Sequence, residues 1–235
     1  MKLSLKSTKM FNRIFLLLSI MMIGGLSFIG HASATGTLSP IVGLYDANEN
    51  QVVQKPNRLL LISSDIDNPN TKIDESILLQ QVASNDTIAF VYDPKSETLE
   101  KLVMVIEKIM IEYGVLSFES IALATHGQPG GFCITDGQCL SLKTIYNPLL
   151  NNFWSNISQF SSNRIDLMGC FLGKNTALLS KLSQQTQRTI TASTNITGSP
   201  EKNGDWFLEV GEIDLGKTYF SKELLTQVRT IELNP

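Results

Sequence analysis

Short apolar runs that alternate with longer helical patterns constrain the fold of this sequence more than any other feature. The residues from Leu99 to Tyr113 carry an apolar stripe with a helical period. Six runs have the length of strands: residues 58–64, 86–92, 118–125, 164–168, 189–193 and 206–210. Strands separated by helices indicate parallel pairing with right-handed crossovers. The sequence therefore predicts an α/β fold, a three-layer sandwich whose mostly parallel sheet is flanked by helices.

The first 34 residues have the three parts of a secretory signal peptide. A basic region with Lys2, Lys6, Lys9 and Arg13 precedes an apolar core, and Ala32-Ser33-Ala34 has the small residues of a cleavage site. We expect cleavage near Ala34 and a secreted or periplasmic protein with no stable membrane span after cleavage. An uncleaved membrane anchor is the alternative.

After such cleavage 201 residues remain, enough for one domain with a full core. We expect an N-terminal arm over residues 35–56, the α/β domain over 57–216 and a C-terminal tail over 217–235. The leader removes four of the 19 basic residues, which leaves 15 against 22 acidic ones, a net charge of −7. Such a charge argues against binding of nucleic acid or an anionic membrane.

Three cysteines in an exported chain leave at least one thiol unpaired, or paired with another molecule. Cys133 and Cys139 flank Thr135-Asp136-Gly137, which is typical of a hairpin turn and brings the two cysteines close. A disulfide between them is possible, although cross-strand geometry often does not suit one. If it forms, Cys170 is the unpaired thiol, which is unusual in an oxidising compartment.

His126 and Cys170 each follow a predicted buried strand, beside a glycine. The carboxyl ends of parallel strands are where α/β proteins bind ligands, so a catalytic dyad is one interpretation. Cys170 would be the nucleophile, favoured as thiolate by a helix that begins shortly after it, and His126 the acid and base. The amides of Gly127 and Cys170 are candidate oxyanion donors. Alternatively, both are structural: a small core cysteine and a loop histidine.

Two aspartates are weaker candidates for substrate binding. Asp166 shares a strand face with Cys170, although a structural salt bridge also explains it. Asp205 precedes Trp206, where a turn beside a core tryptophan is the alternative. One histidine and three scattered cysteines in the mature chain do not make a zinc ligand set, so we expect no metal and no cofactor.

Four stretches carry a resemblance to a known family: Thr125-His-Gly-Gln-Pro-Gly130, Met168-Gly-Cys-Phe-Leu-Gly173, Ala192-Ser-Thr-Asn-Ile-Thr-Gly198 and Gly204-Asp-Trp-Phe-Leu-Glu209. Over residues 57–211 these stretches are similar to a bacterial domain of unknown function often found near the start of large repeat-bearing surface proteins. Within them, Ala124-Thr-His-Gly127 followed by Leu167-Met-Gly-Cys170 resembles the caspase and gingipain-like cysteine peptidases, in which a His-Gly ends one strand and a Cys ends the next. The resemblance implies a caspase-like fold and a His126–Cys170 dyad. The caspase pattern Gln-Ala-Cys-Arg-Gly is replaced by Met168-Gly-Cys-Phe-Leu172, so it implies no caspase-like aspartate specificity.

These features favour an exported cysteine peptidase or related thiol hydrolase that acts on a peptide or protein substrate. The alternative is a non-catalytic cell-surface or adhesion module on the same scaffold. A third reading is an enzyme that cleaves only itself. A Cys170 sulfur that is buried, with no cleft between it and His126, would favour the binding module.

Overall fold

The computed structural model describes residues 37–38, 44–45, 51–52, 55–69, 73–226 and 228–233. The predicted signal peptide, residues 1–34, lies outside these residues, as does most of the predicted arm. Within the described part of the chain, no helix is both long and apolar enough to cross a membrane.

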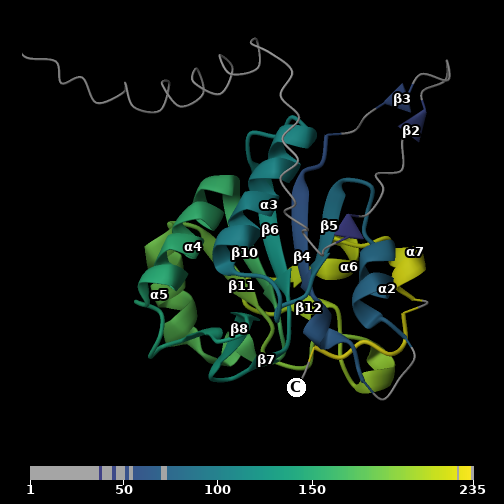
Figure 1. Ribbon diagram of the computed structural model, residues 1–235. Coiled ribbons are helices and arrows are strands. Elements are labelled where there is room, and N and C mark those ends of the chain that lie inside the picture. Colours follow the sequence, from purple (N-terminus) through teal and green to yellow (C-terminus); the bar gives the residue numbers. More distant parts are fainter. Residues whose placement is uncertain are drawn as a thin grey trace, which may run out of the picture. The chain divides into compact units, whose positions relative to one another are not determined.

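A six-stranded sheet forms the centre of the domain, in the order β1-β5-β4-β6-β10-β11 (Figure 1). Its strands are β1 Thr37–Leu38, β4 Arg58–Ser63, β5 Thr87–Tyr92, β6 Phe118–Ala124, β10 Ser161–Met168 and β11 Thr189–Ala192. The last five run parallel, and the edge strand β1 is antiparallel to β5. The predicted mostly parallel α/β fold is confirmed.

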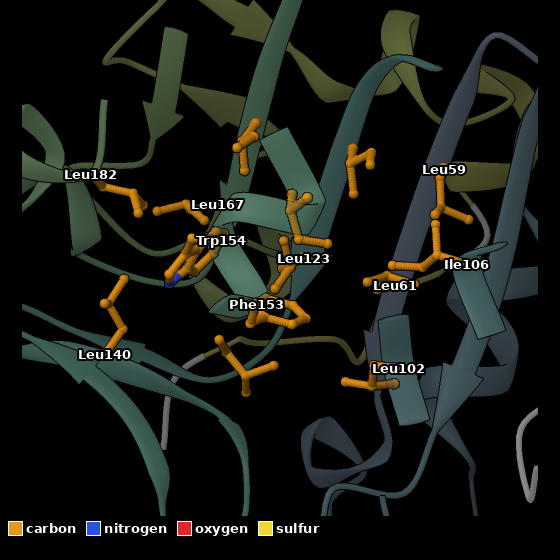
Figure 2. Close-up of a cluster of buried hydrophobic side chains, with 14 of the residues drawn as sticks. Leu59, Leu61, Leu102, Ile106, Leu123, Leu140, Phe153, Trp154, Leu167 and Leu182 are labelled. Carbon is orange, nitrogen blue, oxygen red and sulfur yellow. The ribbon is translucent and has the colours of Figure 1, made fainter. Parts of the chain in front are cut away.

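Helices cover both faces of the sheet (Figure 1). On one face lie α3 Leu99–Glu112, α4 Pro148–Phe160 and α5 Thr176–Thr186, and on the other α2 Glu75–Gln81, α6 Leu215–Thr218 and α7 Lys222–Leu225. Successive residues of a strand point to opposite faces of the sheet. Leu59 and Leu61 belong to the first core, on the side of α3, α4 and α5 (Figure 2), and Leu60 and Ile62 belong to the second core, on the other side. Burial on both faces explains why the strands are apolar runs rather than alternating patterns.

The helix starts are less predictable from the sequence than the strands. The sequence favours Ser96 as the cap of the helix with the apolar stripe. That prediction is wrong, because Thr98 accepts the Lys101 amide and α3 begins at Leu99. The sequence also predicts a mostly helical segment from Leu142 to Phe160, but α4 begins only at Pro148, which suits a first helical turn because it has no N–H to satisfy. For α2 the sequence predicts Thr71 as cap, which lies outside the described residues, and the N-cap position is Asp74.

The described residues form three small sheets besides the main one. The strands β2 Leu44–Tyr45 and β3 Gln51–Val52 pair antiparallel, and β7 Gly127–Gln128, β8 Gly131–Thr135 and β9 Gln138–Ser141 form a three-stranded sheet. The strand expected at 206–210 is shorter, β12 Phe207–Leu208, and pairs with β13 Ile213–Asp214 instead of the main sheet. Two residues after β12 ends, Val210 makes a single antiparallel bridge to Ala192, the last residue of β11.

The described part of the predicted C-terminal tail packs against the domain. Six of its residues beyond α6 belong to the second core: Tyr219, Phe220, Leu225, Val228, Ile231 and Leu233. Burial of this many apolar side chains stabilises the docked segment by several kcal/mol, roughly 2 for each. The tail is therefore part of the folded unit, and its last described residues reach the carboxyl end of the sheet.

Candidate functional site

The predicted juxtaposition of the two strand ends is present in the structure. Strands β6 and β10 are parallel neighbours, with Met168 opposite Ala124. His126 and Cys170 each follow two residues further along. A Cβ built on Gly127 would lie 2.7 Å from the carbonyl carbon of Gly169, so the two backbones are in direct contact. Glycine at 127 permits this approach.

A sharp turn follows Cys170. Phe171 has a positive φ of 61°, a conformation that non-glycine residues seldom adopt, and its amide donates to the Asn195 carbonyl at 2.8 Å. A short 3-10 helix, Leu172–Lys174, comes next, and α5 begins only at Thr176. The turn therefore separates Cys170 from the helix that we expected to favour its thiolate.

The thiol of Cys170 is buried, with no exposed surface. It donates to the Thr197 carbonyl at 3.7 Å and accepts from the Thr197 amide at 3.3 Å. Burial raises the pKa of Cys170 to about 11, and the charge of Glu232 acts in the same direction, against the amide of Thr197. The expectation of a helix-stabilised thiolate is therefore wrong for this conformation, since desolvation dominates.

His126 is half-buried and lines a pocket of about 260 Å³. Its Nδ1 is buried and has no hydrogen-bond partner among the described residues. The pocket also has two unpartnered oxygens within that part of the chain, Asp65 Oδ1 and Thr230 Oγ1. Other charged residues line the pocket: Asp67, Glu75, Lys202 and Glu232. Cys170 is not among the lining residues, so the cleft opens on the imidazole but not on the sulfur.

The amides of Gly127 and Cys170 point at one oxygen atom. The Leu233 carbonyl accepts from the Gly127 amide at 3.1 Å and from the Cys170 amide at 3.2 Å. Two backbone donors that converge on a carbonyl oxygen have the arrangement that stabilises the oxyanion of an acyl-transfer intermediate. The two residues expected as oxyanion donors are thus brought together, on an oxygen of the chain itself.

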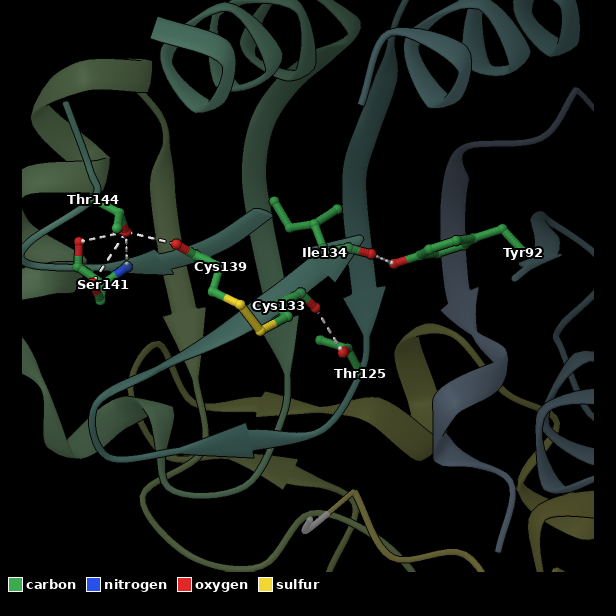
Figure 3. Close-up of a disulfide and its surroundings, with 7 residues drawn as sticks. All are labelled: Tyr92, Thr125, Cys133, Ile134, Cys139, Ser141 and Thr144. Atoms are coloured by element: carbon green, nitrogen blue, oxygen red, sulfur yellow. Dashed lines mark hydrogen bonds between the residues drawn. A yellow bond between two sulfur atoms is a disulfide. The ribbon is translucent and has the colours of Figure 1, made fainter. Parts of the chain in front are cut away.

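The cysteine hairpin supports the strand that leads to His126 (Figure 3). Cys133 and Cys139 face one another across β8 and β9 and form the disulfide considered from the sequence. The Cys133 carbonyl accepts from the Thr125 hydroxyl at 3.0 Å, immediately before His126. Thr135 pairs with Gln138, so the loop has two residues, Asp136 and Gly137, rather than the three expected.

Asp166 has a structural role. It is fully buried and accepts hydrogen bonds from Arg164 Nε at 3.0 Å, from Thr191 Oγ1 at 2.8 Å and from the Tyr219 hydroxyl. Desolvation nevertheless raises the pKa of Asp166, and the Arg164 guanidinium opposes that rise. The carboxylate has no surface for a substrate, and the salt bridge considered from the sequence is the arrangement observed.

Asp205 organises the loop that contacts the thiol. It accepts from the Asn195 side chain at 2.9 Å and from the Phe207 amide at 3.0 Å, and its backbone bridges to Thr197. Asp205 does not line the pocket beside His126. Its contacts are those of a turn residue, and they hold Thr197 and Asn195, which contact Cys170 and Phe171.

Sequence reasoning assigned no role to the residues of other segments that surround His126 and Cys170. Thr197 lies in the motif stretch 192–198, but it contacts the sulfur through its backbone, which the identity of its side chain does not reveal. Leu233 contributes a carbonyl oxygen from a segment that was expected to be a tail. The alternation of Ile231 and Leu233 with polar neighbours was the available signal, since it is typical of a short strand. Among the described residues, no group of three or more His, Cys, Asp or Glu is placed to hold a metal ion.

The fold and the two strand ends define an α/β protein with a cysteine and a histidine at the carboxyl edge of a parallel sheet. A family model described as "Domain of unknown function (DUF4347)" matches residues 59–231. The chain belongs to this family, because the match covers well over half of its length. No curated protein matches the chain.

Proposed function

We propose that the protein is an exported cysteine peptidase or related thiol hydrolase with Cys170 as nucleophile and His126 as its acid and base. One observation carries the proposal: the Gly127 and Cys170 amides hold a single carbonyl oxygen at 3.1 and 3.2 Å. A site built this way can hold the oxygen of a peptide carbonyl while a sulfur beside it attacks the carbon. The resemblance of Ala124-Thr-His-Gly127 and Leu167-Met-Gly-Cys170 to the caspase and gingipain-like peptidases supports the same reaction class.

The proposed reaction proceeds by acyl transfer. His126 removes the thiol proton of Cys170, and the sulfur bonds to the acyl carbon, whose oxygen takes the negative charge. The oxyanion collapses to a thioester as the bond to the leaving amine breaks and His126 returns the proton to that amine. Water, deprotonated by His126, then hydrolyses the thioester and regenerates the thiol. Among the described residues, no hydrogen-bond partner of His126 Nδ1 competes with these transfers.

A non-catalytic surface or adhesion module on the same scaffold is the second candidate. The observation in its favour is the complete burial of Cys170, away from the pocket that His126 lines. In that case the thiol is a small apolar core residue and the pocket binds a ligand without chemistry. This candidate predicts that the reactivity of Cys170 does not depend on His126.

Labelling with a small acyl electrophile separates the two candidates. The native chain, His126→Ala and Cys170→Ala are incubated with the probe, and the modified peptide is quantified by mass spectrometry. A peptidase requires the imidazole to activate the thiol, so we expect His126→Ala to lower the rate at Cys170 about 100-fold. Equal rates in the native and His126→Ala chains would contradict the peptidase and support the binding module.

A further inference from the structure

The last described residues of the chain lie along the site as an additional strand. Leu233 donates its amide to the Thr197 carbonyl at 3.0 Å, and Ser199 donates to the Ile231 carbonyl at 2.7 Å. Glu232 forms the antiparallel bridge with Gly198 between them. These bonds are those of a peptide that adds to an exposed edge in extended conformation.

The side chains of this strand alternate between two environments. Ile231 and Leu233 are fully buried in the apolar cluster that contains Cys170. Thr230 and Glu232 line the polar pocket beside His126. At its end, the Leu233 carbonyl occupies the two oxyanion donors. The segment therefore contacts each part of the proposed catalytic site: the thiol's cluster, the histidine's pocket and the amide pair.

We propose that Thr230–Leu233 occupies the peptide-binding groove as an intramolecular inhibitor, with Leu233 at the position of the acyl residue of a substrate. This inference rests on the proposed peptidase function and assigns its substrate class and its regulation. The substrate is an extended peptide whose residue before the cut bond is apolar and of leucine size. Release of the segment opens the groove and exposes the thiol.

Two features of the site support this assignment. The segment accounts for a buried thiol beside a complete pair of oxyanion donors, which a free enzyme would present to solvent. It also accounts for the high pKa of Cys170, because desolvation and the charge of Glu232, a residue of the segment, both raise it. While the segment is docked, Cys170 stays protonated. It therefore does not attack the Leu233 carbonyl, and the peptide bond after Leu233 is not cleaved.

The first experiment weakens the packing of the segment Thr230–Leu233 and measures the reactivity of the Cys170 thiol. In Leu233→Ala the buried leucine side chain is lost, and we expect the rate of Cys170 alkylation by iodoacetamide to rise about 30-fold or more through easier local opening. Leu224→Ala is the matched control: its side chain is 41% exposed on the neighbouring helix α7. We expect no change in rate for the control, and circular dichroism reports whether each variant is folded.

The second experiment probes the groove in the native chain, and so does not depend on any variant folding. Chloromethyl ketones of acetyl-Thr-Ile-Glu-Leu and of acetyl-Thr-Ile-Glu-Asp differ only at the acyl residue. We expect the leucine probe to label Cys170 at least about tenfold faster, because a buried apolar site rejects a carboxylate. Equal rates for the two probes, or unchanged alkylation in folded Leu233→Ala, would overturn the inference.

The two proposals fail in different ways. If small-probe labelling depends on His126 but neither Leu233→Ala nor the leucine probe has an effect, the peptidase stands and the inhibitory segment is refuted. If Leu233→Ala exposes the thiol but His126→Ala changes none of the labelling rates, the segment is only a structural cover and the peptidase function is refuted together with its inhibitor.

Discussion

Replacing Gly127 by alanine tests the contact between the two strand ends on which the site depends. The added Cβ would lie 2.7 Å from the Gly169 carbonyl carbon and 2.8 Å from both the amide nitrogen and the carbonyl oxygen of Cys170. All three are backbone atoms, which cannot rotate away as a side chain does. The alanine must therefore push the loop after β6 away from the loop after β10.

The cost of this displacement follows from the packing of the interior. Overfilling a close-packed site by one methyl group costs about 1–3 kcal/mol when the neighbours are rigid. For a domain of this size each kcal/mol lowers the Tm by roughly 2–4 °C. The displacement also separates the Gly127 amide from the Cys170 amide, so we expect loss of His126-dependent labelling in addition to a lower Tm.

Thermal unfolding followed by circular dichroism measures the first effect, and acyl-probe labelling the second. Gly130→Ala is the matched control, because the same methyl group three residues further on meets no atom within 4 Å. We expect the control to retain the native Tm within about 2 °C, as a surface substitution does. If Gly127→Ala and Gly130→Ala have the same Tm and labelling rate, the close approach of the two loops is refuted.

Three further predictions concern the disulfide, the buried ion pair and the thiol. Replacing Cys133 and Cys139 by serine removes their disulfide and should lower the free energy of unfolding by about 2 kcal/mol, because the unfolded chain regains the entropy of a short closed loop. Thiol titration of the native chain, denatured without reductant, should count one free cysteine. Asp166→Asn leaves the Arg164 guanidinium without its buried carboxylate and should cost about 3 kcal/mol in a urea titration, with Cys170 labelling unchanged. In the folded chain the pKa of Cys170 is raised from 9.0 to about 11. Its contribution to the free energy of unfolding should therefore be constant below pH 9 and decline as the pH rises toward 11. Urea unfolding measured from about pH 7 to 11 tests this, and a decline no larger than that of Cys170→Ala would contradict it.

The sheet was predictable from the sequence because its strands are buried on both faces. Runs such as Leu59–Ile62 and Ile121–Ala124 contain no polar residue and are as short as strands, a combination typical of strands that are covered on both faces. The neighbouring positions of β6 and β10 followed from the short chain between them and from the preference for local crossovers. The positions of His126 and Cys170 at the carboxyl edge of the sheet were therefore predictable, but the burial of the thiol was not.

The features that the sequence did not reveal depend on contacts between distant segments. Cys170 is buried among residues distant in sequence: its sulfur bonds to the backbone of Thr197, and its amide donates to the Leu233 carbonyl. Desolvation by this burial is the largest cause of its raised pKa. The N-cap of α3 is Thr98 and not the predicted Ser96. Serine and threonine both suit an N-cap, so residue type alone does not choose between these two positions. The short strand Phe207–Leu208, which we expected in the main sheet, pairs with β13 instead.

A crystal structure of the chain labelled at Cys170 with the acetyl-Thr-Ile-Glu-Leu chloromethyl ketone tests the central claim most directly. The account predicts that the ketone-derived oxygen of the probe lies between the amides of Gly127 and Cys170, that the probe pairs with Thr197–Ser199, and that the chain's own Leu233 is displaced. A probe oxygen remote from both amides, with the Leu233 carbonyl still bound to them, would contradict it.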